Sequence, residues 1–150
     1  MQYFYGMLPT TKPGLLFIDD DPDDGNELKI SLQAIDPDIN FLQVFDGWNA
    51  IMHLQKLLPH EQPQLIVLDI NMRIINGFEF LKIVKEDSRF QKIPVVVYST
   101  STRPEHKTLS IQLGAVDYFT KPDTTEGIEV IASTFVQKLS HAVQLSTTFG

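Results

Sequence analysis

The sequence predicts one α/β domain, in which helices cover both faces of a parallel five-stranded sheet. Five short apolar runs lack polar alternation, which is typical of parallel strands buried on both faces. Each run is followed by a stretch whose apolar residues recur at helical spacing. Strict alternation of strand and helix requires right-handed crossovers, and these place helices on both sides of the sheet. The 150 residues suit a single domain of this kind.

The predicted strands are short, and most of them end in a polar side chain or a turn. They comprise residues 15–18, 41–45, 65–68, 94–98 and, more weakly, 116–119. The second is closed by the turn pair Asp46-Gly47.

The predicted helices fill the segments between and after these strands. The first begins with Asp21 as its N-cap and Pro22 at its first position. The others span residues 47–58, 77–87, 104–113 and about 124–143. Helical spacing predicts that the following residues face the core: Leu28, Leu32, Ile35, Ile51, Leu54, Leu58, Phe78, Leu81, Val84, Ile128, Ile131, Phe135 and Leu139.

Composition excludes several classes of function. The chain has no cysteine, which rules out disulfides, thiolate metal centres and a cysteine nucleophile. Its net charge of −7 disfavours direct binding of nucleic acid. No apolar run approaches the roughly 20 residues that span a bilayer, and residues 1–14 do not resemble a secretory signal. We therefore expect a cytoplasmic protein without membrane insertion.

Polar side chains follow four of the five predicted strands, whereas the second strand delivers none. Asp19 and Asp20 follow the first strand, Asp69 the third, Ser99 the fourth, and Lys121 comes just after the fifth. Parallel sheets bind ligands outside the carboxyl ends of their strands, so we expect these groups to meet at one edge. Each residue alone is typical of a cap, a turn or a solvated surface; their joint placement favours a site.

The residue types at this edge suit phosphoryl transfer. Crowded carboxylates repel one another unless a cation joins them, and ligands that are all oxygen favour Mg²⁺. An aspartate can accept a phosphoryl group, and the transfer needs mainly positioning and charge neutralisation. The sequence therefore predicts phosphorylation on Asp69, with Mg²⁺ and Lys121 as the positive partners and Ser99 as a hydroxyl donor.

With these residues in place, the sequence resembles the receiver domain of two-component response regulators, of the stand-alone, chemotaxis-regulator-like kind. The resemblance covers about residues 14–140 and is carried by the motifs LLFIDDDP, LIVLDINMRIINGFEFLK, IPVVVYSTS and GAVDYFTKP. It implies the flavodoxin-like fold with strand order 2-1-3-4-5. The implied function is a signalling module, not an enzyme, that promotes its own Mg²⁺-dependent phosphorylation and dephosphorylation.

The resemblance also assigns roles to single residues. It implies Asp19, Asp20, Asp69 and the backbone carbonyl of Asn71 as the metal ligands, with Asp19 acting chiefly through water. It implies Asp69, Ser99 and Lys121 as the reacting and phosphate-binding groups. The remaining implied roles are Thr100 as the small neighbour that guards access, Tyr118 as an aromatic switch, Asn76-Gly77 as the turn before the third helix, and a cis peptide bond between Lys121 and Pro122.

One position departs from the family pattern, and two other functions compete with the leading one. Arg73 stands where the family usually has proline. This difference removes none of the groups that the chemistry needs. A phosphatase with an aspartyl nucleophile would want a second aspartate where Asn71 stands. A receiver-like domain that binds partners without phosphorylation would not need Asp20, Asp69, Ser99 and Lys121, and their presence argues against it.

The resemblance implies partners, and the ends of the chain are expected to lie outside the domain. A sensor histidine kinase or a histidine phosphotransfer protein would supply the phosphoryl group, and a downstream protein would read it. A homodimer through the face formed by residues 104–143 is a further candidate. We expect an N-terminal tail over residues 1–13, a receiver domain over 14–143 and a C-terminal tail over 144–150.

Overall fold

A computed structural model describes residues 14–149 of the chain, and the side chains of residues 14–141. The strands are β1 (Gly14–Ile18), β2 (Asn40–Val44), β3 (Leu65–Leu68), β4 (Val95–Ser99) and β5 (Asp117–Thr120). The helices are α2 (Pro22–Ile35), α3 (Gly47–Gln55), α4 (Gly77–Glu86), α5 (Pro104–Gln112), α6 (Thr125–Phe149) and a short 3₁₀ turn, η1 (Pro59–Glu61). The predicted tail over residues 1–13 lies outside the described residues.

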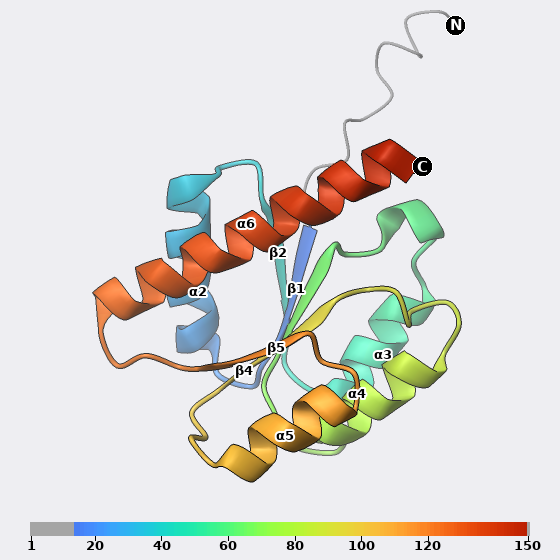
Figure 1. Ribbon diagram of the computed structural model, residues 1–150, viewed down its shortest axis with the longest axis horizontal. Coiled ribbons are helices and arrows are strands. Elements are labelled where there is room, and N and C mark those ends of the chain that lie inside the picture. Colours follow the sequence, from blue (N-terminus) through green and yellow to red (C-terminus); the bar gives the residue numbers. More distant parts are fainter. Residues whose placement is uncertain (1–13, 150) are drawn as a thin grey trace, which may run out of the picture.

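The five strands form one parallel sheet in the order β2-β1-β3-β4-β5, as predicted. Helices α2 and α6 lie on one face, whereas α3, α4 and α5 lie on the other (Figure 1). Successive residues of β1 face opposite sides, since side chains alternate along a strand. Leu15 and Phe17 therefore pack with the residues of α2 and α6, while Leu16 and Ile18 pack with those of α3 and α4.

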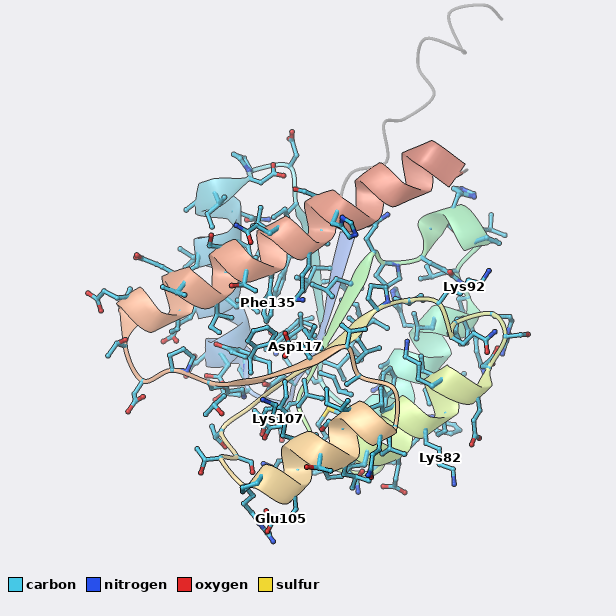
Figure 2. All side chains as sticks on the ribbon, viewed as in Figure 1. Lys82, Lys92, Glu105, Lys107, Asp117 and Phe135 are labelled. Atoms are coloured by element: carbon cyan, nitrogen blue, oxygen red, sulfur yellow. The ribbon has the colours of Figure 1, made fainter. Side chains whose placement is uncertain are left out.

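Aromatic side chains hold α6 on the sheet. Phe135 is fully buried and lies between this helix and the strands, whereas Glu105 on α5 points away from the body of the protein (Figure 2). The Phe135 ring meets the rings of Tyr98 and Phe119 edge-on, at centroid distances of 5.8 and 5.4 Å. This geometry is favourable beyond the burial itself, so the cluster fixes the helix that follows Lys121 along the chain.

Two residues that the helical spacing predicted to face the core are exposed instead. Helix α3 ends at Gln55, before residue 58, because proline at position 59 disfavours helical backbone at the residue before it. Leu58 is accordingly 57% exposed. Ile35 is the last residue of α2 and is 49% exposed, so the buried stripe of this helix ends at Leu32.

The last helix is longer than the sequence predicted. It was expected to end near residue 143, yet α6 continues to Phe149 and so includes most of the predicted C-terminal tail. No proline interrupts this stretch, and its residues tolerate helix. Within the described chain, no helix is both long and apolar enough to cross a membrane.

Candidate functional site

The predicted acidic residues meet at the carboxyl edge of the sheet. Strands β1 and β3 are parallel neighbours, so the residues that follow them emerge side by side. The backbone N–H of Asp69 donates to the carbonyl of Ile18 at 2.9 Å, which continues the strand pairing to the end of β3. Asp19, Asp20 and Asp69 each offer a carboxylate oxygen within 4.8 Å of the others. Asp19 and Asp69 are buried, whereas Asp20 is exposed.

This donor set fits a hard divalent cation, and the three carboxylates are not equally free to bind it. Asp19 has both oxygens engaged: Oδ1 accepts from the N–H of Asp21 at 2.9 Å and Oδ2 from Lys121 at 2.6 Å. Asp20 and Asp69 are therefore the more available ligands. An oxygen-only set with two available carboxylates is the arrangement that Mg²⁺ prefers in proteins.

Burial makes Asp69 hard to ionise. Removal from water, opposed by the positive charge of Lys121 and aided by the negative charge of Asp19, raises the pKa of Asp69 to about 6. The backbone of Asn71 lowers this pKa and the charge of Asp20 raises it, both more weakly. Burial also raises the pKa of Asp19. Ionisation of these two carboxyls therefore costs free energy, and a bound cation would lower that cost.

Lys121 supplies the positive charge of the site, but its contacts differ from those predicted. Its Nζ donates to Asp19 Oδ2 at 2.6 Å and to Asp24 Oδ2 at 2.7 Å. Burial lowers the pKa of Lys121, but the hydrogen bonds to the two acids outweigh it, so the pKa lies above its usual value. The Nζ also lies 5.8 Å from the centre of the Tyr98 ring.

The predicted cis bond between Lys121 and Pro122 is wrong, because every peptide bond in residues 14–149 is trans. The trans form is the more stable one even before proline. It still lets the amine reach Asp19, since the Lys121 N–H is anchored to the Ser99 carbonyl at 2.7 Å.

The two hydroxyl-bearing positions after β4 have different environments. Ser99 is fully buried, and its Oγ accepts from the N–H of Ser101 at 3.2 Å. Thr100 is exposed. Tyr118 is nearly buried, and its hydroxyl donates to the Ser101 carbonyl at 2.7 Å. The Ser101 backbone therefore connects the predicted switch hydroxyl of Ser99 to the predicted aromatic switch of Tyr118.

The loop after Asp69 carries backbone strain where the sequence departs from the family pattern. Asn71 and Arg73 are exposed in this loop. Ile74, directly after Arg73, has φ of 68°, a left-handed conformation that costs a β-branched residue on the order of 1–3 kcal/mol. The loop ends at the predicted turn, where Asn76 caps α4 by accepting from the N–H of Glu79 at 2.9 Å.

Gly77 is required at the start of α4 by a close approach. A Cβ on Gly77 would lie 2.5 Å from the carbonyl oxygen of Asp69 and 2.5 Å from Cα of Ile70, closer than side chains come to backbone. The first turn of α4 thus packs directly on the backbone that carries the candidate phosphoacceptor.

Sequence reasoning missed two residues that organise the site. Gln43 on β2 donates from Nε2 to the carbonyls of Asp19 and Asp21, at 2.9 and 3.0 Å, so the second strand also contributes to this edge. A signal was available, since Gln43 is the one polar residue in an apolar run. Asp24, the second partner of Lys121, gave no signal apart from its place in a run of acids, which the helix start alone explains.

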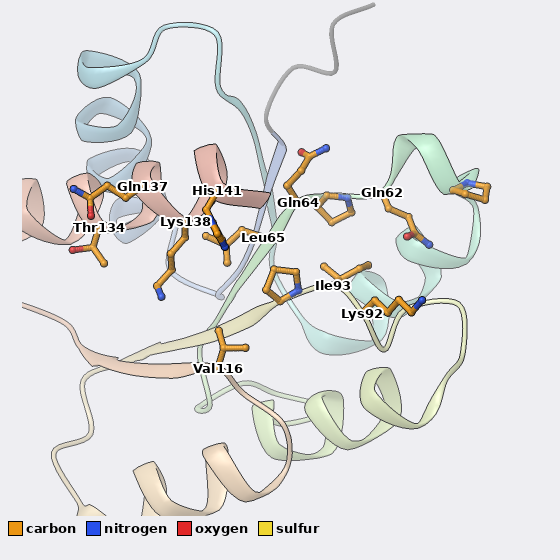
Figure 3. A pocket seen from close by; sticks show the side chains of 13 residues that line it. Gln62, Gln64, Leu65, Lys92, Ile93, Val116, Thr134, Gln137, Lys138 and His141 are labelled. Carbon is orange, nitrogen blue, oxygen red and sulfur yellow. The ribbon is translucent and has the colours of Figure 1, made fainter. Parts of the chain in front are cut away.

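A separate hollow of about 860 Å³ lies away from the acidic cluster, between η1, the start of β4 and α6 (Figure 3). Its walls include Leu65, Ile93, Val116 and Lys138, and none of the predicted site residues. Leu65 begins β3, whereas Asp69 follows the end of that strand. The hollow therefore belongs to the opposite edge of the sheet, and the chemistry of the carboxyl edge identifies the site.

Comparisons with known proteins agree with this geometry. The family model of the response regulator receiver domain matches residues 15–133. The DNA-binding dual master transcriptional regulator RpaA of Synechocystis is 32% identical over 114 residues, which are 76% of this chain and 45% of RpaA. The chemotaxis protein CheY1 of Helicobacter pylori is 26% identical over 124 residues, which are 80% of this chain and 97% of CheY1. This chain spans less than half the length of RpaA and of the response regulator Rre1.

Solved structures share the same architecture. The phosphorylated cyanobacterial phytochrome response regulator RcpA superposes with a TM-score of 0.75 at 26% identity, over 82% of this chain and 90% of RcpA. The Mn²⁺-bound form of the response regulator Rcp1 gives 0.73 at 27% identity, over 82% of this chain and 94% of Rcp1. CheY4 of Vibrio cholerae gives 0.70 at 27% identity, over 86% of this chain and 99% of CheY4. The chain therefore belongs to the response regulator receiver domains of two-component signalling.

Proposed function

We propose that this receiver domain accepts a phosphoryl group on Asp69 in a Mg²⁺-dependent reaction and thereby switches its binding to a partner protein. The observation that carries the proposal is the buried carboxylate of Asp69, which shares one sheet edge with two other carboxylates and the amine of Lys121. The donor would be a phosphohistidine of a sensor kinase or of a histidine phosphotransfer protein. The domain promotes this transfer, and the later hydrolysis, on its own side chain.

The transfer needs Asp69 as a carboxylate. An oxygen of Asp69 forms a bond to phosphorus while the bond between phosphorus and the donor's imidazole nitrogen breaks, and the bonding electron pair stays with that nitrogen. The pKa of about 6 leaves Asp69 mostly ionised at neutral pH. Its raised basicity favours attack, because more of the negative charge is available to the phosphorus.

Asp20, Asp69 and the backbone carbonyl of Asn71 would hold Mg²⁺, and Asp19 would act through water. When bound, the ion neutralises negative charge on the transferring phosphoryl oxygens. The support for this assignment is the cluster of carboxylates within 4.8 Å and the engagement of both Asp19 oxygens by protein donors.

Lys121 and Ser99 would bind the phosphoryl group from the other side. The amine lies within the electrostatic reach of Asp69, since its charge lowers the pKa of that carboxyl. Ser99 is buried at the end of β4, next to β3, and can donate its hydroxyl hydrogen to a phosphoryl oxygen. Thr100 beside it is small enough to leave access to the group.

Tyr118 would transmit the change to the surface. Its hydroxyl is bonded to the Ser101 carbonyl, and the Ser101 N–H is bonded to Ser99 Oγ, so movement of Ser99 towards a phosphoryl group disturbs both contacts. Helix α5 begins three residues after Ser101 and α6 five residues after Thr120. The surface around the β5 edge of the sheet, formed by residues 104–143, is therefore the proposed surface for a downstream partner or a second copy.

The test is phosphorylation by a small donor. Wild type incubated with acetyl phosphate and Mg²⁺ should gain one phosphoryl mass by intact mass spectrometry, and a metal chelator or the variant Asp69→Asn should abolish the gain. Asp23→Asn serves as a matched control, because it removes an exposed carboxylate outside the acidic cluster, and it should be phosphorylated to the wild-type extent. Phosphorylation of Asp69→Asn to the wild-type extent, or phosphorylation independent of Mg²⁺, would contradict the proposal.

A further inference from the structure

Lys121 bridges two acids that come from different elements. Asp19 follows β1, whereas Asp24 lies in the first turn of α2, three residues after the N-cap Asp21. The Lys121 side chain is 10% exposed, that of Asp19 is 1% exposed and that of Asp24 is 31% exposed. The amine therefore ties the beginning of α2 to the loop between β5 and α6.

Under the proposed function, one of these two contacts has to yield. Lys121 donates to Asp19 and Asp24 and not to Asp69, so its amine has to move to reach a phosphoryl group on Asp69, and that movement lengthens one of the two short bonds. Asp19 is buried, so loss of its partner would leave an unpaired charge out of water. Asp24 is partly exposed at a helix N-terminus, where water and the helix dipole stabilise a carboxylate. Asp24 is therefore the partner that Lys121 can release at the lower cost.

We propose that Asp24 is a positioning residue that competes with the phosphoryl group for Lys121. This inference rests on the proposed function. The carboxylate of Asp24 holds the amine through a charge-assisted hydrogen bond of 2.7 Å, and the phosphoryl group on Asp69 draws the amine away from it. Asp24 thus weakens the phosphorylated state by favouring the other arrangement of Lys121.

Release of Asp24 would also carry a signal. Helices α2 and α6 pack against each other on one face of the sheet (Figure 1). Lys121 connects the start of α2 to the loop that leads into α6, so movement of its amine away from Asp24 removes a contact between these two segments. This face is opposite the one covered by α5 (Figure 1), whose side of the sheet holds Tyr118, the partner of the Ser101 carbonyl.

The charge-neutral variant Asp24→Asn tests the competition. Beryllofluoride mimics the phosphoryl group, and its affinity at saturating Mg²⁺ can be measured by calorimetry. Asp24→Asn should bind beryllofluoride about fivefold more tightly than wild type, the scale expected for loss of one partly exposed ion pair. Asp23→Asn removes the same charge from the same helix turn without touching Lys121, and it should leave the affinity within about twofold of wild type.

Two further variants separate competition from a general charge effect. Asp24→Glu restores the carboxylate and should return the affinity towards that of wild type. In the Lys121→Gln background, the gain from Asp24→Asn should disappear, because no amine remains to be released. A gain that persists at full size in that background would overturn the proposal, since Asp24 would then act only as a nearby negative charge.

The side-chain amine of Lys121 gives a readout that a purely structural role would not move. Its nitrogen signal in NMR spectra should shift in Asp24→Asn and stay in place in Asp23→Asn, and beryllofluoride should shift the wild-type signal. If wild type binds beryllofluoride but Asp24→Asn binds it equally or more weakly, the inference is overturned and the proposed function stands. If wild type with Mg²⁺ does not bind beryllofluoride at all, both are overturned.

Discussion

Replacing Asp69 by asparagine should stabilise the metal-free protein, and the gain should depend on pH. Burial raises the pKa of Asp69 from 3.8 to about 6. A folded-state pKa above the unfolded value means that the folded protein binds the proton more tightly. Stability is therefore lost as the pH rises from about 4 to about 6, and it stays lost at higher pH. Asparagine keeps the shape and has no such titration.

The magnitude follows from the pKa difference. A shift of about 2 units, at 1.36 kcal/mol per unit, corresponds to about 3 kcal/mol as an upper value. Solvent screening reduces this free energy only slightly, because Asp69 is only 5% exposed. The free energy of unfolding of Asp69→Asn, relative to wild type, should thus rise by about 2–3 kcal/mol between about pH 4 and about pH 7.5.

Urea unfolding at a series of pH values, with a chelator present, measures this difference. Asp23→Asn is the matched control, since it removes an exposed carboxylate that lies outside the cluster and is not among the groups that shift the pKa of Asp69. Saturating Mg²⁺ should shrink the advantage of Asp69→Asn, because the ion stabilises the wild type by mass action. A difference between Asp69→Asn and wild type that does not change with pH would refute the reasoning.

Three further substitutions probe other parts of the account. Lys121→Met should destabilise the protein by about 3 kcal/mol at neutral pH, because it leaves the buried Asp19 carboxylate without its partner. The loss should be smaller near about pH 4.5, because burial raises the pKa of Asp19 and favours its neutral form there. Urea unfolding at both pH values measures the difference. Gly77→Ala should lower the free energy of unfolding by about 1–3 kcal/mol and weaken Mg²⁺ binding, because its Cβ would displace the Asp69 carbonyl. Calorimetric titration measures the Mg²⁺ affinity, and an affinity equal to that of wild type would contradict this prediction. Phe135→Ala should cost about 3–5 kcal/mol in urea unfolding through the cavity it leaves, while Mg²⁺ affinity stays unchanged.

The sequence predicted the fold well because buried parallel strands carry a strong signal. All five apolar runs became strands to within a residue, and the helices followed between them. Element ends were less predictable, since they depend on single residues: the proline after Leu58 ends α3 early, and nothing in the sequence stops α6 at residue 143. Ile35 continues the spacing of Leu28 and Leu32 but is exposed, because periodicity does not determine how far along a helix the packing extends.

The site was predictable where it depends on strand ends, and not where it depends on contacts across elements. Asp19 and Asp69 follow neighbouring strands, so sequence order and sheet topology alone bring them together. Gln43 on β2 and Asp24 on α2 contact the site through their side chains. The directions of these side chains depend on how the two elements pack, which the sequence pattern does not specify. The cis bond between Lys121 and Pro122 was expected from the family resemblance alone, whereas the structure has the trans form, which is the more stable one.

The most direct test of the central claim is to locate the phosphoryl group. Reduction of an acyl phosphate with borohydride converts the modified aspartate to homoserine, which peptide sequencing by mass spectrometry identifies. After incubation with acetyl phosphate and Mg²⁺, we expect homoserine at position 69 and aspartate at positions 19, 20 and 24. Homoserine at one of the other three positions, with Asp69 unmodified, would contradict the account.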